Sequence, residues 1–374
     1  MRILHVVGRM NRGGAETWLM NVLRHVDPVD FRMDFLVHTA KRGAYDDEIR
    51  DIGSQVIPCL NPKYPPQYAH NFKRVIQEYG PYDVVHSHVH HYSGFVLRLG
   101  HSVDVQTLIA HGHTDARMTE EKVGKPRRMY LRLMKRMISR YADYGLAASE
   151  TAAEDLFGPD WANDPRWRVL YCGIDLEPFK QFVNPRQIRA ELGIPEDAFV
   201  VGHVGRFTEE KNHAFLIDIA HEVAKVAADT RFLLVGDGPL RRTIERKVEN
   251  SGLRGKVIFT GVRPDVPRLM KGAMDAFILP SFREGLPMVL IEAQAAGLPC
   301  MFSDFVSEEA DIVKHIVRRM PMDGRAAIWT SAIFDLRRNK TTSKDPKAVT
   351  VVEHSAFNIT SSVKELVRVY EGCN

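Results

Sequence analysis

The strongest constraint in this sequence is a regular alternation of short apolar runs, rich in β-forming residues, with segments of helical periodicity. This alternation is typical of parallel sheets whose strands are joined by crossover helices. The first series of expected strands comprises residues 2–7, 33–38, 56–60, 83–88, 105–110, 144–148 and 168–171. The second comprises residues 199–204, 231–235, 256–260, 275–279 and 299–302. The pattern predicts an α/β fold with two open parallel sheets.

A stretch rich in proline and turn-forming residues, 173–185, separates the two series and predicts an interdomain connection. With 374 residues, the chain also exceeds what a single hydrophobic core usually supports. We expect one Rossmann-like domain over residues 1–180, a second over 181–355 and a final helix over 359–370. Two such sheets would bind ligands at the carboxyl ends of their strands, around a shared central cleft.

Composition excludes several classes of protein. A hydrophobic share of 44% and a charged share of 26% are ordinary for a globular domain. No apolar run approaches the ~20 residues that a membrane span needs, and the N-terminus continues as a strand rather than a signal peptide. The cysteines form no metal or redox spacing, at Cys59, Cys172, Cys300 and Cys373. We expect a cytoplasmic protein that binds no nucleic acid.

Charge is unevenly distributed, because residues 122–142 hold eight basic side chains and no acidic one. Apolar residues recur at helical spacing in the same stretch, which predicts an amphipathic basic helix. Two interpretations stay open: a solvated helix face that packs on its own domain, or attraction to an anionic membrane surface or a phosphate-bearing acceptor. The second would place the protein at the inner face of the plasma membrane.

Two glutamates frame the segment 281–297, which follows an apolar strand. Pro287 and Gly297 delimit an expected helix over 286–296, with Glu284 on the entering loop and Glu292 on the second turn. The free N–H groups of a helix N-terminus favour an anion. A ligand with phosphate at the helix N-terminus and hydroxyl groups at the two glutamates fits a nucleotide sugar. The alternative, two merely solvated charges, is weakened because this helix is apolar nearly all round.

Glycine-containing loops follow the first strand of each series. Gly13 and Gly14 precede a helix expected over 15–25, and Gly205 begins a loop that leads to a helix expected from Lys211. Arg206 and Lys211 suit a diphosphate, one as a planar fork and one as a point charge. A lysine at a helix start is disfavoured by the dipole unless an anion is near. A simple strand-to-helix turn remains the alternative for each loop.

Two weaker signals lie in the second series. The glycines around Gly236 fail the dinucleotide fingerprint, because Arg241 occupies the third glycine position, and they predict a turn beside the nucleotide. The loop at Val262 follows a strand and could offer backbone groups to a base.

Histidines cluster in the first series, at His86, His88, His90, His91, His111 and His113. A metal site is conceivable, but no acidic residue joins them at ligand spacing, so we predict that no metal is held. His111 ends a strand, where an imidazole could contact a donor sugar or developing charge. No nucleophile elbow or reactive cysteine environment indicates a hydrolase.

Taken together, Gly13-Gly-Ala-Glu16, Gly205-Arg206 with Lys211, and Glu284 to Glu292 resemble glycosyltransferase family 4, which comprises retaining enzymes of the GT-B fold. The likeness is closest to bacterial members that assemble capsular and extracellular polysaccharides, and it covers residues 1 to about 304. It departs at Cys172, where relatives commonly carry asparagine. The resemblance also implies that helix 356–374 crosses back onto the first domain.

The resemblance implies a role for each matching residue. Glu284 would contact donor-sugar hydroxyls, Glu292 would hold the ribose, and Arg206 and Lys211 would bind the diphosphate. Backbone N–H groups near Gly285 and Leu286 would assist, with Gly14 approaching the phosphates and His111 lying beside the anomeric carbon.

The expected activity is transfer of a hexosyl unit from a UDP- or GDP-linked sugar to a sugar or lipid-linked glycan acceptor, with the anomeric configuration retained. The family's front-face displacement requires no divalent metal and no further cofactor. Two alternatives stay open: a GT-B epimerase or hydrolase acting on the same nucleotide sugar, and a non-catalytic nucleotide-sugar-binding partner.

Overall fold

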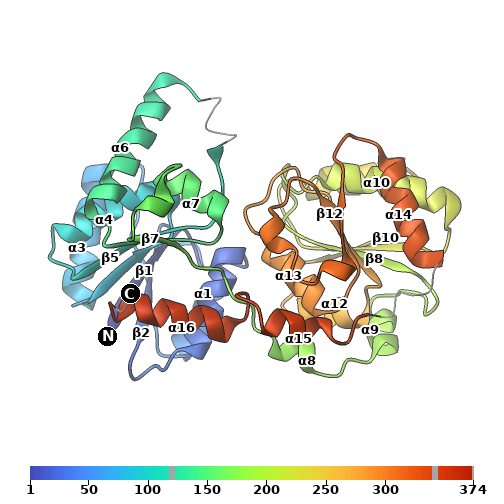
Figure 1. Ribbon diagram of the computed structural model, residues 1–374, viewed down its shortest axis with the longest axis horizontal. Coiled ribbons are helices and arrows are strands. Elements are labelled where there is room, and N and C mark those ends of the chain that lie inside the picture. The colour runs from blue at the N-terminus through green and yellow to red at the C-terminus, as the bar shows by residue number, and fades with distance from the viewer. Residues whose placement is uncertain (118–122, 339–343, 373–374) are drawn as a thin grey trace. The chain divides into compact units, whose positions relative to one another are not determined.

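The computed structural model describes residues 1–117, 123–338 and 344–372, and it divides into two compact units (Figure 1). Unit 1 comprises Met1–Ile174 with Ile359–Asn374, and unit 2 comprises Asp175–Asn358. The sequence had placed these boundaries at 180/181 and 355/356. The two compact units divide at 174/175 and 358/359 instead, and the domain assignment stays a prediction.

Unit 1 is built on a seven-stranded sheet in the order β3-β2-β1-β4-β5-β6-β7, and all its pairings are parallel. The strands are β1 (Arg2–Val7), β2 (Arg32–Val37), β3 (Val56–Pro58), β4 (Val84–Ser87), β5 (Thr107–Gly112), β6 (Tyr144–Ala147) and β7 (Trp167–Val169). The helices are α1 (Gly14–His25), α2 (Asp46–Asp51), α3 (Pro65–Tyr79), η1 (His90–Tyr92), α4 (Ser93–His101), α6 (Lys125–Tyr141), α7 (Glu150–Phe157), η2 (Trp161–Asn163) and α16 (Ile359–Tyr370). Strands buried on both faces explain the near-continuous apolar runs in the sequence.

The last helix, α16, belongs to unit 1 although the preceding chain runs through unit 2, and it packs against α1 (Figure 1). Its bounds confirm the helix expected over 359–370. Its buried stripe includes Val363 and Leu366, as an amphipathic helix requires. The Trp18 indole donates a hydrogen bond to Ser362 Oγ (3.0 Å), and that hydroxyl donates to the Tyr171 carbonyl (2.9 Å). Packing and buried polar contacts therefore both anchor α16.

Unit 2 is built on a six-stranded sheet in the order β10-β9-β8-β11-β12-β13, again parallel throughout. The strands are β8 (Val200–Val204), β9 (Arg231–Val235), β10 (Val257–Gly261), β11 (Ala276–Leu279), β12 (Cys300–Ser303) and β13 (Val317–Met320). The helices are α8 (Glu177–Lys180), α9 (Pro185–Glu191), α10 (His213–Val226), α11 (Arg241–Asn250), α12 (Val266–Gly272), α13 (Met288–Ala295), η3 (Glu308–Ala310), η4 (Lys314–Ile316), α14 (Ala326–Arg338) and α15 (Ala348–Glu353). On one face, Trp329 of α14 meets Phe215 of α10 within the core.

Each sheet reverses its strand order once. In unit 1 the reversal lies between β1 and β4, and in unit 2 it lies between β8 and β11. Loops that leave the carboxyl ends of such neighbouring strands diverge to opposite faces, and the crevice between them is the usual ligand site of an open α/β sheet. The two glycine-containing loops and the acidic loop singled out in the sequence leave β1, β8 and β11.

The basic helix is α6, over Lys125–Tyr141, so Lys122 of the expected stretch lies outside the described residues. Leu131, Met134 and Ile138 are its buried residues. In the part of the chain that the structure describes, no helix combines the length and the apolar character that crossing a membrane requires.

Candidate active site

The two loops at the switch point of unit 2 are joined by main-chain and side-chain contacts. The Phe282 N–H donates to the Glu210 carbonyl (2.8 Å). Lys211 Nζ lies 2.5 Å from Glu284 Oε1, with side chains 21% and 10% exposed. The sequence predicted separate roles for these two residues, 73 positions apart, and the fold brings them together. In this partly buried setting, each charge compensates the other.

Lys211 does not begin a helix, so that expectation is wrong. Helix α10 begins at His213, and Asn212 is its N-cap, with φ at +51° and its side-chain oxygen accepting from the Phe215 N–H (3.4 Å). Asparagine tolerates this left-handed backbone and caps helices well. Glu284, rather than a helix-bound anion, therefore compensates the Lys211 charge in the structure.

Arg206 follows β8 and is exposed. Among the described residues, its guanidinium has no hydrogen-bond or ion-pair partner. Arg189 of the same unit differs, because it is largely buried and its Nη2 donates to both oxygens of the Asp275 carboxylate at 2.7–2.8 Å. Arg206 is therefore a cation at the switch point that the protein's own acids leave available.

The acidic loop leads into α13, which begins at Met288, two residues later than expected. Its N-cap is Pro287, with no side-chain cap hydrogen bond, so the first N–H groups after Gly285 and Leu286 stay open to an anion. Glu292 lies on the second turn, partly buried, and desolvation raises its pKa to about 7. Within the described ranges no donor pairs with its carboxylate.

The turn at Gly236 is held between two neighbouring loops. Gly236 N–H donates to the Gly261 carbonyl (2.8 Å), and Gly205 N–H donates to the Val235 carbonyl (3.0 Å). Gly236 has φ at +136°, and a Cβ there would overlap the Gly205 carbonyl oxygen. Only glycine suits that position, and the expected role of this segment beside the nucleotide stays a prediction. Val262, just past β10, is 55% exposed.

In unit 1, Gly13 is the N-cap of α1, and Gly14 is its first residue. Apart from the adjacent residues and the backbone of its own helix, no heavy atom of the described residues lies within 4 Å of a Cβ built on Gly14. Packing inside the protein therefore does not demand glycine there, whereas close approach of a ligand to the backbone would.

A cluster of buried imidazoles lies on the neighbouring strands β1, β4 and β5. His86 Nε2 lies 3.2 Å from His111 Nδ1, and His86 Nδ1 lies 2.9 Å from the Tyr370 hydroxyl. Burial lowers the pKa of His86 and His111 well below the ordinary value, so both rings are neutral. His111 Nε2 is buried, and no described residue pairs with it.

A second imidazole chain runs beside the first. His88 lies between His5 (3.0 Å) and His113 (2.9 Å), and His113 Nδ1 lies 3.7 Å from Cys172 Sγ. Cys172, where the sequence departs from the family pattern, is thus the last member of this series of imidazole contacts. Sequence reasoning missed His5 and Tyr370; alternation along β1 was a signal for His5, but Tyr370 is 284 positions from His86.

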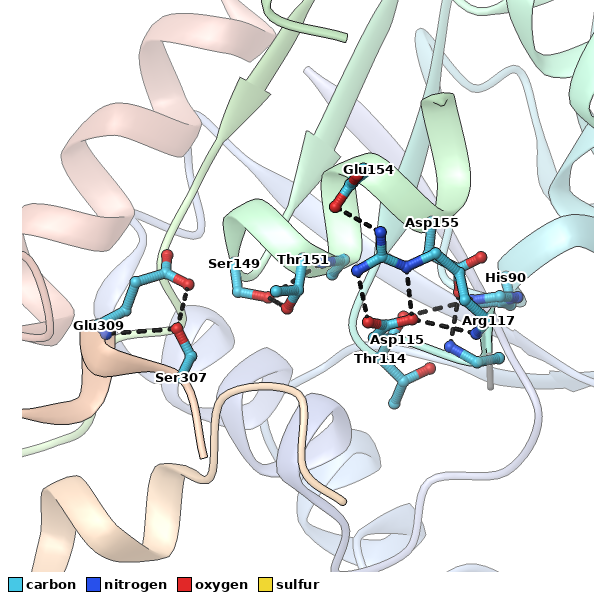
Figure 2. A network of polar contacts seen from close by, with 12 residues as sticks. His90, Thr114, Asp115, Arg117, Ser149, Thr151, Glu154, Asp155, Ser307 and Glu309 are labelled. Carbon is cyan, nitrogen blue, oxygen red and sulfur yellow. Dashed lines mark hydrogen bonds and ion pairs between the residues drawn. The ribbon is translucent and has the colours of Figure 1, made fainter. Parts of the chain in front are cut away.

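An acidic residue does join the histidines, contrary to the sequence expectation. Asp155 of α7 accepts from His90 Nε2 at 3.1 Å (Figure 2). Asp155 also accepts from the Ala116 N–H (2.7 Å), and Lys135 Nζ lies 3.7 Å from its carboxylate. Arg117 forks onto Asp115 beside it. His90 and Asp155 are 65 positions apart, so ligand spacing along the chain could not indicate their contact.

Within the described parts of the chain, three groups have ring nitrogens or carboxylate oxygens close enough to hold a metal ion: His5 with His86 and His88, His88 with His111 and His113, and His90 with His91 and Asp155. In the first two, the imidazoles already hydrogen-bond one another. In the third, Lys135 supplies the positive charge beside Asp155. These contacts engage part of each group, although His5 Nε2 and His111 Nε2 are buried without a hydrogen-bond partner among the described residues. The absence of a metal stays a prediction.

Comparisons with known proteins agree with this architecture. Residues 12–178 match the family model described as Glycosyltransferase Family 4, and residues 184–325 match Glycosyl transferases group 1. The putative glycosyltransferase EpsF of Bacillus subtilis is 35% identical over 89% of this chain and 86% of its own length. The capsular polysaccharide biosynthesis glycosyltransferase CapH of Staphylococcus aureus is 24% identical over 99% of this chain and 98% of its own.

The fold is shared with a solved structure, HepE from Anabaena in complex with UDP and glucose. Its TM-score is 0.82 at 21% identity, covering 99% of each chain. The family and the GT-B fold expected from the sequence are thereby confirmed. The chain belongs to glycosyltransferase family 4 and is a glycosyltransferase of the GT-B fold.

Proposed function

We propose that this enzyme transfers a hexosyl unit from a nucleoside-diphosphate sugar to a sugar or lipid-linked glycan acceptor in polysaccharide biosynthesis, with retention of the anomeric configuration. Relatives and structural neighbours support the substrate class. Their names include a capsular polysaccharide glycosyltransferase and a galactosyltransferase acting on a diphosphoundecaprenol-linked sugar, and HepE was solved with UDP and with UDP-glucose. UDP is therefore the first nucleotide to test, with GDP as the alternative.

The donor's diphosphate binds Arg206, Lys211 and the N-terminus of α13. Lys211 is held by Glu284 in the unliganded protein, and a diphosphate would compete for the ammonium group. The exchange would release the Glu284 carboxylate to accept hydrogen bonds from the donor sugar. Glu292 accepts from the ribose hydroxyls, while Gly236 and Val262 lie beside the base. Gly14 brings backbone N–H groups to the phosphates.

In the transfer step, the bond between the anomeric carbon and the diphosphate oxygen breaks as the acceptor oxygen bonds to the same face of that carbon. The acceptor's proton passes to the departing diphosphate oxygen, so atoms and charge balance. Positive groups already in place stabilise the leaving group, as preorganised charges stabilise other transition states. His111 contributes a neutral imidazole to the sugar, since burial lowers its pKa.

The observation that carries this proposal is the Lys211–Glu284 pair beside the unpaired Arg206 at the unit 2 switch point. Donor binding is measured by thermal shift with UDP, GDP, UDP-glucose and GDP-mannose. Because a bound ligand stabilises the folded state by mass action, wild-type protein should melt at higher temperature with one nucleotide series. Lys211→Ala should lose that shift.

The matched control is Lys225→Ala, which removes an exposed lysine paired with Glu222 on the same helix. It should retain the full nucleotide shift. Equal shifts for the Lys211→Ala and Lys225→Ala proteins would contradict the donor site. Product analysis with an acceptor panel then separates transfer from simple hydrolysis or epimerisation of the donor.

We also propose that α6 associates with an anionic membrane surface that carries the acceptor. Met129 and Leu133 on this helix are 72% and 49% exposed, and exposed basic residues surround them: Lys125, Arg127, Arg128, Arg132, Arg136 and Arg140. Basic side chains around protruding apolar ones suit an anionic interface. Cosedimentation with phosphatidylglycerol vesicles should fall for Arg132→Glu/Arg136→Glu, whereas phosphatidylcholine vesicles should bind neither protein. Unchanged cosedimentation would contradict this assignment.

A further inference from the structure

A series of hydrogen bonds connects Tyr370, in the last turn of α16, to His111. The Tyr370 hydroxyl lies 2.9 Å from His86 Nδ1, and His86 Nε2 lies 3.2 Å from His111 Nδ1. Tyr370 is 3% exposed, and His86 and His111 are fully buried. All three belong to unit 1. Water therefore does not compete for these contacts, and the groups themselves determine which atom donates in each one.

The donor-to-acceptor direction of this hydrogen-bond series follows from the Tyr370 hydroxyl at its end. Burial raises the pKa of Tyr370 well above its ordinary value, so the hydroxyl keeps its proton. Among the described residues, its one hydrogen-bond partner is His86 Nδ1. With the reverse direction, the buried Tyr370 O–H and the lone pair of His111 Nε2 would both lack partners, whereas this direction leaves one N–H unpaired, at His111 Nε2. Each unpaired buried group is costly, so Tyr370 donates and His86 Nδ1 accepts.

The two ring nitrogens of a neutral imidazole carry one N–H and one lone pair. A ring that accepts at one nitrogen must therefore donate at the other. With Nδ1 accepting, the His86 proton is on Nε2 and is donated to His111 Nδ1. The His111 proton must then be on Nε2, a buried atom that no described residue satisfies. The geometry points to Tyr370 as a positioning residue that fixes His111 as the Nε2–H tautomer, a hydrogen-bond donor held ready for the sugar or the developing charge.

The neighbouring series of imidazoles lacks a phenol, and the comparison shows how the Tyr370 hydroxyl sets the hydrogen-bond direction. It runs from His5 through His88 and His113 to Cys172, with Sγ 3.7 Å from His113 Nδ1. A thiol is both a weak donor and a weak acceptor, so it does not impose a direction on the three imidazoles. Only the chain that ends at Tyr370 has its sense set by an obligatory donor, and that is the chain that contains His111.

The tautomer of His111 is measured by two-bond ¹H–¹⁵N spectra of the unliganded full-length protein labelled with ¹⁵N-histidine. The His111 signals are assigned by their loss in His111→Gln. Wild-type protein should show the proton on Nε2. Tyr370→Phe keeps the ring and removes the donor, so the two tautomers become comparable in cost and an Nδ1–H population should appear.

The matched control is Ser362→Ala, which removes the buried hydroxyl that contacts Trp18 from the same helix and leaves the Tyr370 chain intact. It should leave the His111 signals as in wild type. An Nδ1–H signal for wild-type His111 would overturn the inference, and so would a Tyr370→Phe spectrum identical to wild type. If Tyr370→Phe did not fold, the wild-type spectrum would still show whether the His111 proton is on Nε2.

The kinetic consequence rests on the proposed role of His111 in sugar transfer. If the Nε2–H form is the competent one, kcat/KM of Tyr370→Phe should fall in proportion to the remaining fraction of that tautomer. A spectrum that changes as expected while kcat/KM stays at the wild-type value would refute the role of His111 and leave the tautomer assignment intact. The two failures are therefore distinguishable.

Discussion

The two units share a parallel topology and a single reversal of strand order, yet their switch points differ in chemistry. In unit 2, the loops after β8 and β11 carry Arg206, Lys211 and Glu284. In unit 1, the strands at the reversal carry neutral, hydrogen-bonded imidazoles such as His86, with His111 on the adjacent strand. The fold determines where a ligand can bind, and the side chains decide whether charge or directed hydrogen bonds meet it.

The largest expected effect tests whether charge in unit 2 drives the leaving group. Arg206→Ala should lower kcat by about 10²- to 10³-fold, the loss typical of removing one preorganised transition-state donor. The kcat of Arg206→Lys should lie between those of wild type and Arg206→Ala, because lysine keeps the charge and loses the planar fork. The melting temperature should stay near that of wild type, since Arg206 is exposed. Turnover is measured with the donor identified by thermal shift.

Arg254, also exposed in unit 2, provides the matched control for that series. Arg254→Ala should turn over at the wild-type rate. If Arg206→Ala turned over as fast as Arg254→Ala, the charge at the unit 2 switch point would not stabilise the leaving group. The proposed contrast with the neutral switch point of unit 1 would then be wrong.

The second test compares one glycine from each unit. Gly236→Ala should destabilise the protein by about 3 kcal/mol, because the left-handed backbone strains any side chain and the added Cβ overlaps the Gly205 carbonyl. Gly14→Ala should leave the free energy of unfolding nearly unchanged, since nothing lies within 4 Å, yet it should weaken donor binding. Urea unfolding and nucleotide thermal shifts measure both. If Gly14→Ala bound nucleotide as wild type does, Gly14 would have no place in the site.

The smallest expected effect concerns Glu292, whose pKa is raised by burial from 4.5 to about 7. Between these values the folded protein binds a proton that the unfolded chain has lost, so the free energy of unfolding falls as pH rises through this window. The contribution is about 1–2 kcal/mol, because some solvent reaches the side chain. Glu292→Gln should remove this part of the pH dependence, which urea unfolding at pH 5 and pH 8 measures.

If Glu292 accepts from the ribose as proposed, the same Glu292→Gln protein should bind nucleotide more weakly at pH 8, where the wild-type side chain is a carboxylate. A variant that retained both the wild-type pH dependence and the wild-type affinity would show that the carboxylate acts on neither stability nor binding.

Local pattern predicted the strands and the helix over 359–370, because apolar periodicity and caps are properties of neighbouring residues. The same reasoning placed the start of α10 at Lys211 and missed the Asn212 cap, whose left-handed backbone has no periodic signal. The family and the GT-B fold were predicted from motif residues spread over both series, and the comparisons confirmed them.

Long-range partners could not be predicted from the sequence. Glu284 and Lys211 were each identified as site residues, but their contact depends on β11 pairing with β8. Asp155 reaches His90 only after α7 packs onto the sheet of unit 1. Tyr370 reaches His86 only when α16 returns to unit 1. Spacing along the chain says nothing about contacts that tertiary packing creates.

The return of α16 has a consequence for biosynthesis on the ribosome. Residues 175–358 form a contiguous piece, so they can complete their sheet as soon as they leave the exit tunnel. The Trp18 indole, by contrast, must wait for Ser362, 344 residues downstream. Unit 1 is therefore begun before unit 2 and completed after it, when α16 has been synthesised.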